Sequence, residues 1–308
     1  MPTSKAKSNA IKERSSTTSS NKKLPGDGIE CKETISEEEA HEKKRWLQHN
    51  SDPKEQVRDY MKATTSLRMK ELKDEATAMS DFLNDWPRLL DFPGMIEVDF
   101  RNLFGQETSE HLTRKWTDEF AERIFRFGAQ QKDMPAEMLN EDGTAHPQAV
   151  LQLLPMFLPT GKVRKASGKS LLATRSEAVE SFIDQKPSST NLPGYLDEIL
   201  GSRERPQPFI LLLGERCTPS NGKSYVIVEG RAIMVESLLK AVDTCFKVIY
   251  VLDLHYPNQC ATTWEFIQKV IFEIGDQDGK NKKATSPCVR NIRAYLNNCS
   301  TSSIPCSS

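Results

Sequence analysis

Three apolar runs punctuate residues 206–274 of this 308-residue chain: Phe209-Ile210-Leu211-Leu212-Leu213, Tyr225-Val226-Ile227-Val228 and Val248-Ile249-Tyr250-Val251-Leu252. Such short apolar runs predict strands whose two faces are both covered. The loop 214–224 lets the first two strands pair antiparallel as a long-looped hairpin. A helical pattern separates the second and third runs, which favours a βαβ crossover with parallel strands. A capping-box pattern at Thr262–Glu265 predicts one more helix, which completes a small three-stranded α/β unit over residues 206–275.

Three polar residues follow the second and third predicted strands. Glu229 follows the second run, and Asp253 and His255 follow the third. The carboxyl ends of parallel strands meet at one edge of a sheet, where α/β proteins bind ligands. These residues therefore form the candidate catalytic cluster, for acid–base chemistry or metal binding. The alternative is a rim of solvated charges. Since no nucleophile, glycine-rich cradle or zinc-ligand spacing accompanies them, the sequence predicts no metal site and no cofactor.

Helical periodicity dominates residues 41–130. Through 57–86 apolar residues recur at the helical period while the other face is charged, which predicts a core stripe or a short coiled coil. A second stripe is rich in aromatic residues: Leu112, Trp116, Phe120, Ile124 and Phe127. Together these patterns predict a charged helix and a helical bundle on which the α/β unit packs. Residues 131–205 are predicted to be an irregular linker with short helices, one opened by a capping box at Thr174–Glu177.

A basic loop bracketed by glycines occupies residues 161–170. Its cations are the candidate contacts to phosphate or nucleic acid: Lys162, Arg164, Lys165 and Lys169. A P-loop needs a glycine five positions before Gly168, where Val163 stands, so this loop is not a nucleotide cradle. The alternative is a solvated basic loop without a ligand.

The two ends of the chain are polar and basic. Residues 1–40 contain almost no large apolar side chain, so we expect a disordered basic tail, and we expect a second disordered tail over 276–308. The body between the tails is acidic, and the formal net charge of the chain is only −1. The whole protein therefore has no electrostatic footprint for DNA or a membrane.

The pattern of cysteines and the length of the apolar runs indicate in which cellular compartment the protein works. The seven cysteines are scattered and odd in number, which is typical of reduced thiols rather than of a disulfide framework. The N-terminus lacks the apolar core of a signal peptide, and the apolar runs are too short to span a bilayer. We expect a cytoplasmic or nuclear protein that is neither secreted nor inserted in a membrane.

Several core and turn motifs carry a family resemblance. They are Trp86-Pro87-Arg88-Leu89, Pro93-Gly94-Met95-Ile96, Asp99-Phe100, Leu103-Phe104-Gly105, Pro208–Gly214, Val226–Gly230, Tyr256-Pro257 and Thr263-Trp264-Glu265-Phe266. These motifs resemble a large family of uncharacterised vertebrate proteins, expanded in fishes, of which some are labelled sterile alpha motif domain-containing protein three-like. The likeness covers roughly residues 80–275, without the sterile alpha motif itself. It implies a shared core and no particular activity.

The sequence thus predicts an α+β protein: a mostly helical region, a small three-stranded α/β unit and disordered tails. The preferred function is a non-enzymatic protein-interaction or scaffold module with unidentified protein partners, because a well-specified core carries no complete chemical motif. One alternative is a nucleic-acid-associated protein of mobile-element origin that uses the basic ends and the loop 162–169. The other is an enzyme that uses Glu229, Asp253 and His255. The sequence sets no oligomeric state.

Overall fold

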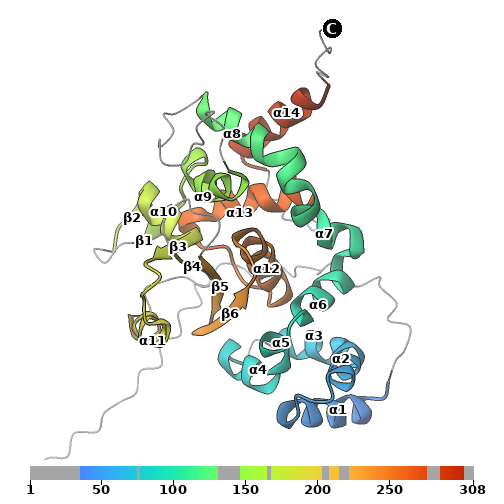
Figure 1. The fold of residues 1–308 in the computed structure, drawn as a ribbon. Helices are drawn as coiled ribbons and strands as arrows, with labels where there is room; N and C mark the ends of the chain where they lie inside the picture. Colours follow the sequence, from blue (N-terminus) through green and yellow to red (C-terminus); the bar gives the residue numbers. More distant parts are fainter. Residues whose placement is uncertain are drawn as a thin grey trace, which may run out of the picture.

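The computed structural model describes residues 35–74, 77–130, 146–164, 168–202, 208–214, 222–275 and 285–301. Helices surround one small central sheet, and a second, two-stranded sheet lies at the side of the molecule (Figure 1). The predicted α+β class is confirmed, since most described residues are helical and the strands form these two sheets.

The first part of the chain is the predicted helical region. It contains α1 (Glu37–His49), α2 (Lys54–Ala63), α3 (Thr65–Leu72), α4 (Met79–Asp85), α5 (Arg88–Asp91), α6 (Met95–Phe104), α7 (Gln106–Lys115), the π-helical turn η1 (Trp116–Phe120) and α8 (Ala121–Ala129). Most of the predicted aromatic stripe is buried: Leu112, Trp116, Ile124 and Phe127. These side chains form core rather than a surface for stacking bases.

The central sheet has four strands instead of the predicted three. β3 (Ile183–Lys186), β4 (Phe209–Leu213), β5 (Lys223–Val228) and β6 (Arg231–Val235) lie side by side in that order. β3 is parallel to β4, whereas β4–β5 and β5–β6 are antiparallel. The first two predicted strands and their antiparallel pairing are therefore confirmed.

The third predicted strand is wrong, because residues 248–252 lie in and just after a helix. α12 (Leu238–Val251) runs through this stretch, and β6 follows β5 directly where the crossover helix was expected. Every side chain of α12 from Ala241 to Ile249 is buried. A helix that is buried all round gives a continuous apolar run, which periodicity cannot distinguish from a buried strand. The predicted βαβ crossover does not occur between β5 and residue 252.

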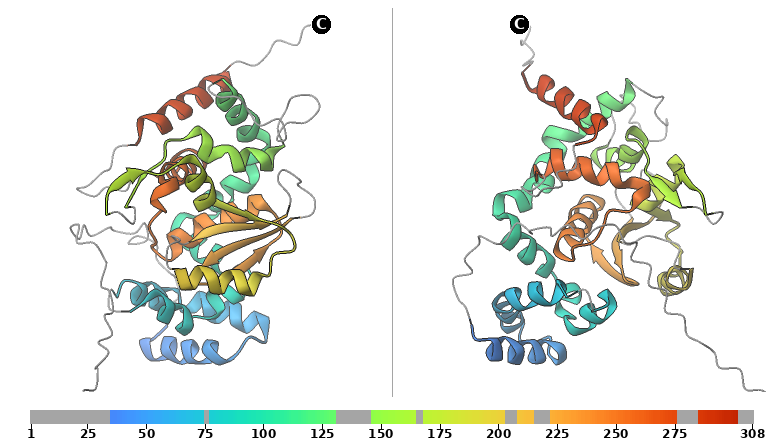
Figure 2. Two further views of the ribbon diagram at one scale, coloured as in Figure 1. Left: turned by 90° about the vertical axis from the view of Figure 1, so that its left-hand side faces the viewer. Right: turned by 180° about the vertical axis from the view of Figure 1, so that it is seen from behind.

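Different helices cover the two faces of the central sheet (Figure 2). α12 packs on one face, where Ile210, Leu212, Val226 and Val228 join the main core. α11 (Leu192–Ser202) lies on the other face, over a smaller cluster that contains Tyr195, Phe209, Leu211, Leu213, Tyr225 and Ile227. Because both faces are covered, β4 and β5 are apolar at nearly every position.

The predicted linker 131–205 contributes to the core as well. It holds α9 (Pro147–Phe157), α10 (Arg175–Phe182) and α11, the strand β3 and both strands of the small sheet. The predicted capping box opens α10, since the Thr174 hydroxyl accepts from the N–H of Glu177 and the Glu177 carboxylate accepts from the N–H of Thr174. The helix ends at Phe182, where β3 begins.

The second predicted capping box is not formed. After η3 (Asn258–Cys260), helix α13 (Ala261–Phe266) begins one residue before Thr262, and the π-helical turn η4 (Ile267–Ile271) extends it. Glu265 instead accepts a hydrogen bond of 2.8 Å from the N–H of Ser286, at the start of the next helix. Trp264, Ile267 and Ile271 are fully buried, as the sequence predicts for this helix.

A C-terminal helix occupies part of the predicted disordered tail. α14 (Pro287–Thr301) buries Val289, Ile292 and Leu296, and its Tyr295 ring lies 5.2 Å from that of Phe127. The prediction is wrong for these residues, because their apolar side chains recur at the helical period and pack on α8 and α13. The prediction is also wrong for residues 37–40 of the N-terminal tail, which form the first turn of α1 and bury Ala40. Residues 1–34, 276–284 and 302–308 of the predicted tails lie outside the described residues.

Candidate protein-interaction surface

A β-hairpin stands out from the side of the molecule. β1 (Lys162–Arg164) and β2 (Ser170–Leu172) pair antiparallel, with Lys162 opposite Leu172 and Arg164 opposite Ser170. Figures 1 and 2 show this hairpin projecting from the side of the body. All strand residues of the hairpin except Val163 are exposed. No described strand adjoins it, so the sheet ends at β1 on one side and at β2 on the other.

The stem of the hairpin is fixed to the body. The Thr160 hydroxyl donates to the carbonyl of Ala173 at 2.6 Å, and the N–H of Ala173 donates to the carbonyl of Gly161 at 2.9 Å. The N–H of Gly161 donates in turn to the carbonyl of Gln259 in η3. A Cβ atom on Gly161 would lie 1.8 Å from the carbonyl oxygen of Asn258, so glycine is required for this close approach.

The stem also determines which backbone groups of the hairpin face outward. The bond from Ala173 to Gly161 makes these two residues a hydrogen-bonded antiparallel pair. Hydrogen-bonded and non-hydrogen-bonded pairs alternate along an antiparallel ladder. Lys162–Leu172 and Arg164–Ser170 are therefore the non-hydrogen-bonded pairs. Their backbone N–H and C=O groups point away from the hairpin, those of Ser170 and Leu172 along the free edge of β2.

Two exposed leucines lie on this edge strand. Leu171 is 51% exposed and Leu172 is 63% exposed, among the largest exposures of an apolar side chain in the described residues. Successive residues of a strand point to opposite faces, so each face of the hairpin carries one leucine. Exposed apolar side chains with a polar rim mark interaction sites on soluble proteins.

Basic side chains surround the leucines. Lys162, Arg164 and Lys169 are all exposed, and no ion pair joins them to another described residue. The described part of the hairpin contains no Asp or Glu. The side chains of a non-hydrogen-bonded pair lie closest together, which places Lys162 beside Leu172. Three of the four predicted phosphate contacts thus lie on the hairpin, and Lys165 lies outside the described residues.

Two of the predicted catalytic residues, Glu229 and Asp253, lie in turns at the ends of secondary-structure elements. Glu229 (φ 45°) and Gly230 (φ 70°) form the two-residue turn between β5 and β6, where both positions need positive φ. Asp253 (φ 46°) follows α12, and the N–H of Leu254 donates to the carbonyl of Ile249, which is the pattern of a helix C-cap.

The grouping of these residues came from the strand predicted at 248–252, and that strand is a helix. Glu229, Asp253 and His255 are all exposed. Among the described residues, no group of three or more His, Cys, Asp or Glu side chains is arranged to hold a metal ion.

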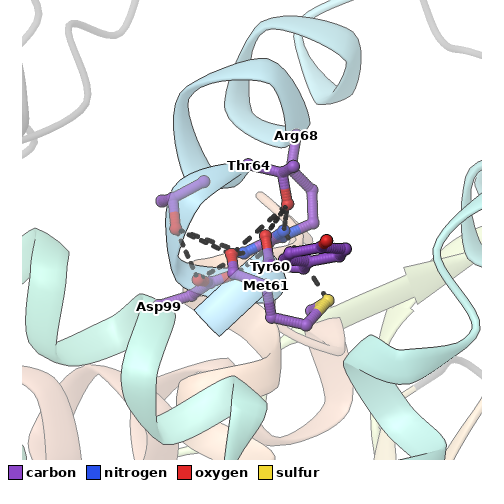
Figure 3. Close-up of polar contacts among 6 residues, drawn as sticks. Tyr60, Met61, Thr64, Arg68 and Asp99 are labelled. Atoms are coloured by element: carbon purple, nitrogen blue, oxygen red, sulfur yellow. Dashed lines mark hydrogen bonds and ion pairs between the residues drawn. The ribbon is translucent and has the colours of Figure 1, made fainter. Parts of the chain in front are cut away.

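A buried polar cluster ties α3 to α6 (Figure 3). Arg68 and Asp99 form an ion pair, and each side chain is 1% exposed. Arg68 also donates to the carbonyl of Met61 at 3.0 Å and to the hydroxyl of Thr64 at 3.2 Å. The Trp86 ring lies 5.1 Å from the guanidinium. Since its polar groups bond to one another, the cluster is a structural clamp rather than a ligand site.

A second charged cluster joins α6 to α12. Lys240 lies 2.7 Å from Glu97 and 3.0 Å from the buried Asp243, which also pairs with Lys247 at 2.7 Å. Burial disfavours the charged form of Glu97, but the hydrogen bond and charge of Lys240 outweigh burial and lower the pKa of this carboxyl. For Lys247, burial outweighs the neighbouring Asp243 and lowers its pKa. One oxygen of Asp243 has no hydrogen-bond partner among the described residues.

Two further features of the described residues concern the cysteines and the length of the helices. None of Cys245, Cys260 and Cys288 forms a disulfide, and burial raises the pKa of Cys245 well above its ordinary value, which favours the protonated thiol. Within the described ranges, every helix is too short or too polar to cross a lipid bilayer.

No family model, no curated protein and no solved structure matches the chain. The resemblance to the fish-expanded family therefore stays a prediction.

The sequence pointed to the basic loop but missed the leucines. Leu171 and Leu172 follow the cations directly, and three-residue strands are too short to show a periodicity of two. The signal available was a pair of large apolar residues between a basic loop and the capping box at Thr174. Their exposure follows only from the projection of the hairpin away from the core.

Proposed function

We propose that this chain is a non-enzymatic protein-interaction module of the cytoplasm or nucleus, and that the β1–β2 hairpin is its docking element. The observation that carries the proposal is the exposure of Leu171 and Leu172 on a projecting, basic hairpin. Covering exposed apolar surface is favourable by about 25 cal/mol per Å². A protein partner that covers both leucines would therefore gain affinity from them. That Cys245, Cys260 and Cys288 form no disulfide supports a reducing compartment.

The test is a native pulldown with the full chain after nuclease treatment, quantified by mass spectrometry. We expect the double variant Leu171→Ser/Leu172→Ser to capture at least about tenfold less of the partner than the wild type. A factor of ten corresponds to about 1.4 kcal/mol of binding free energy. Met234→Ser is the matched control, because Met234 is 68% exposed but lies on β6 of the other sheet. Equal capture by the wild type and both variants would refute the proposal.

Nucleic-acid binding is the second candidate function, and the exposed cations of the hairpin favour it. Replacement of Lys162, Arg164 and Lys169 by Gln would weaken such binding for every nucleotide sequence. Binding of the wild type would also fall steeply as the salt concentration rises, because phosphate contacts release counterions. A gel-shift series with wild type and triple variant tests both points. Binding that ignores salt, or is the same for both chains, rules this candidate out.

A further inference from the structure

We infer that an extended segment of the protein partner pairs with the free edge of β2 as a third strand. The segment carries apolar residues beside Leu171 and Leu172 and an acidic residue beside Ser170. This inference rests on the proposed function, since it names how the hairpin docks and which chemistry it selects.

The backbone of β2 supplies the first argument. Ser170 and Leu172 are the residues whose N–H and C=O groups point away from β1, and no described strand or helix bonds to them along that edge. Unpaired groups at a sheet edge are a template for an added strand. A two-stranded hairpin is also only marginally stable, so a third strand stabilises it. β1 is the less open edge, because its stem residue Gly161 bonds to η3.

The two leucines supply the second argument. Leu171 and Leu172 are adjacent, so they project from opposite faces of the hairpin, and both are exposed. A flat surface contacts only one face of a hairpin. A strand that lies beside β2 in the plane of the sheet gives each leucine a neighbour on its own face. Strand addition therefore accounts for both exposed leucines at once.

The basic residues supply the third argument. Arg164 lies directly opposite Ser170, and Lys162 lies on the same face. An acidic residue of the added strand beside Ser170 comes within reach of both cations. A basic residue there would be repelled, so charge restricts the edge to partners of opposite sign.

Other classes of partner fit less well. Leu172 lies nearer the stem than Arg164, so a hairpin that entered a bilayer by its tip would bury the cation before the leucine. For nucleic acid, the described hairpin residues include no aromatic ring on which a base can stack.

The test uses a phage-displayed library of linear peptides selected on the full chain, followed by fluorescence anisotropy with an enriched peptide. The decisive comparison is Ser170→Pro against Ser170→Ala. Both variants lose the hydroxyl, but only proline removes the outward N–H, and an edge strand tolerates proline there. We expect affinity to fall about tenfold more for Ser170→Pro than for Ser170→Ala. Enriched peptides should carry acidic residues, and Arg164→Gln should remove that preference.

A second measurement keeps the inference falsifiable if proline distorts the hairpin. Bound peptide should slow amide hydrogen exchange at Ser170 and Leu172, and unchanged exchange at both would overturn strand addition. Leucine-dependent binding to phosphatidylserine vesicles, without peptide binding, would overturn it in favour of a membrane. Equal peptide affinity for Ser170→Pro and Ser170→Ala would also overturn it. If the partner in the pulldown needs the leucines but not the outward N–H, the proposed function stands and strand addition falls.

Discussion

Arg68 holds Asp99 with two parallel hydrogen bonds, from Nε to Oδ2 at 2.9 Å and from Nη2 to Oδ1 at 2.7 Å. The pair joins α3 to α6 and is withdrawn from water. Two opposite charges buried in this way stabilise each other only while both are present. The helical region is therefore sensitive to the loss of either partner alone.

We predict that Asp99→Leu destabilises the protein by about 3–5 kcal/mol, because it leaves the Arg68 guanidinium buried without its counter-charge. The double variant Arg68→Met/Asp99→Leu should recover much of that loss, since neither charge remains. Urea denaturation of the wild type and both variants measures the difference. A double variant less stable than Asp99→Leu would contradict the interpretation of the pair as mutually compensating.

The ion pair between Glu97 and Lys240 predicts a pH dependence. The pKa of Glu97 is lowered in the folded state, so the folded chain binds its proton less readily than the unfolded chain. Its contribution to stability is then present above the ordinary carboxyl pKa of 4.5 and is lost as the pH falls below that value. The stability advantage of the wild type over Glu97→Gln should shrink over this acidic range.

Denaturation curves at several pH values check that expectation. Glu55→Gln is the control, because the Glu55 side chain is 87% exposed. This control should track the wild type through the same pH range. An advantage over Glu97→Gln that stays constant down to the acid transition would show that Glu97 has an ordinary pKa in the folded protein.

Because α14 buries apolar side chains, shortening one of them should lower the stability of the protein. Ile292→Ala removes a side chain that is 1% exposed, and we expect a loss of about 2–5 kcal/mol. Arg293→Ala changes the neighbouring exposed position and should stay within about 0.5 kcal/mol of the wild type. Thermal denaturation of the two variants measures both values. Equal stability of the two would show that α14 does not contribute to the core.

Because Gly161 fixes the hairpin stem to the body, Gly161→Ala should impair docking of the partner although both leucines are unchanged. The added methyl group would collide with the Asn258 carbonyl, so the stem must shift, at a cost of about 1–3 kcal/mol. Amide exchange at Gly161 and Ala173 should accelerate, and partner capture should fall. Gly275→Ala is the control, since no atom lies within 4 Å of its added Cβ. Unchanged capture by Gly161→Ala would show that docking does not depend on the stem.

Because Asp253 has a positive φ, its replacement by glycine should raise the stability of the protein. A residue other than glycine at this positive φ is strained by roughly 1 kcal/mol, so Asp253→Gly should stabilise the fold by up to about that amount. Asp253→Ala should lower the stability instead. A loss of stability in Asp253→Gly would mean that the carboxylate makes a contribution that the C-cap geometry does not explain.

The sequence predicted those elements whose signals are local. The strands at 209–213 and 225–228 carry their own apolar runs, and the capping box at Thr174 uses residues of a single helix turn. The element at 248–252 failed because its apolar character comes from burial on every side of α12. β3 was missed because Ile183-Asp184-Gln185-Lys186 has only one large apolar residue, and its place in the sheet depends on β4.

The candidate site was only half predictable for a related reason. Charge is a property of the sequence, so Lys162, Arg164 and Lys169 could be singled out without a structure. Exposure belongs to the folded chain, and Leu171 and Leu172 have the composition of buried residues. The cluster of Glu229, Asp253 and His255 requires a parallel strand at 248–252, and in the structure this stretch belongs to α12 and its C-cap.

The contact between Glu265 and Ser286 has a consequence for the chain while it is being synthesised. The N-terminus of α14 takes its hydrogen-bond acceptor from α13, and its apolar residues close over α8, which emerges from the ribosome much earlier. Until residues 287–301 have been translated, the nascent chain leaves that part of α8 uncovered. A chaperone that shields apolar surface during translation therefore has a defined place and interval in which to act on this protein.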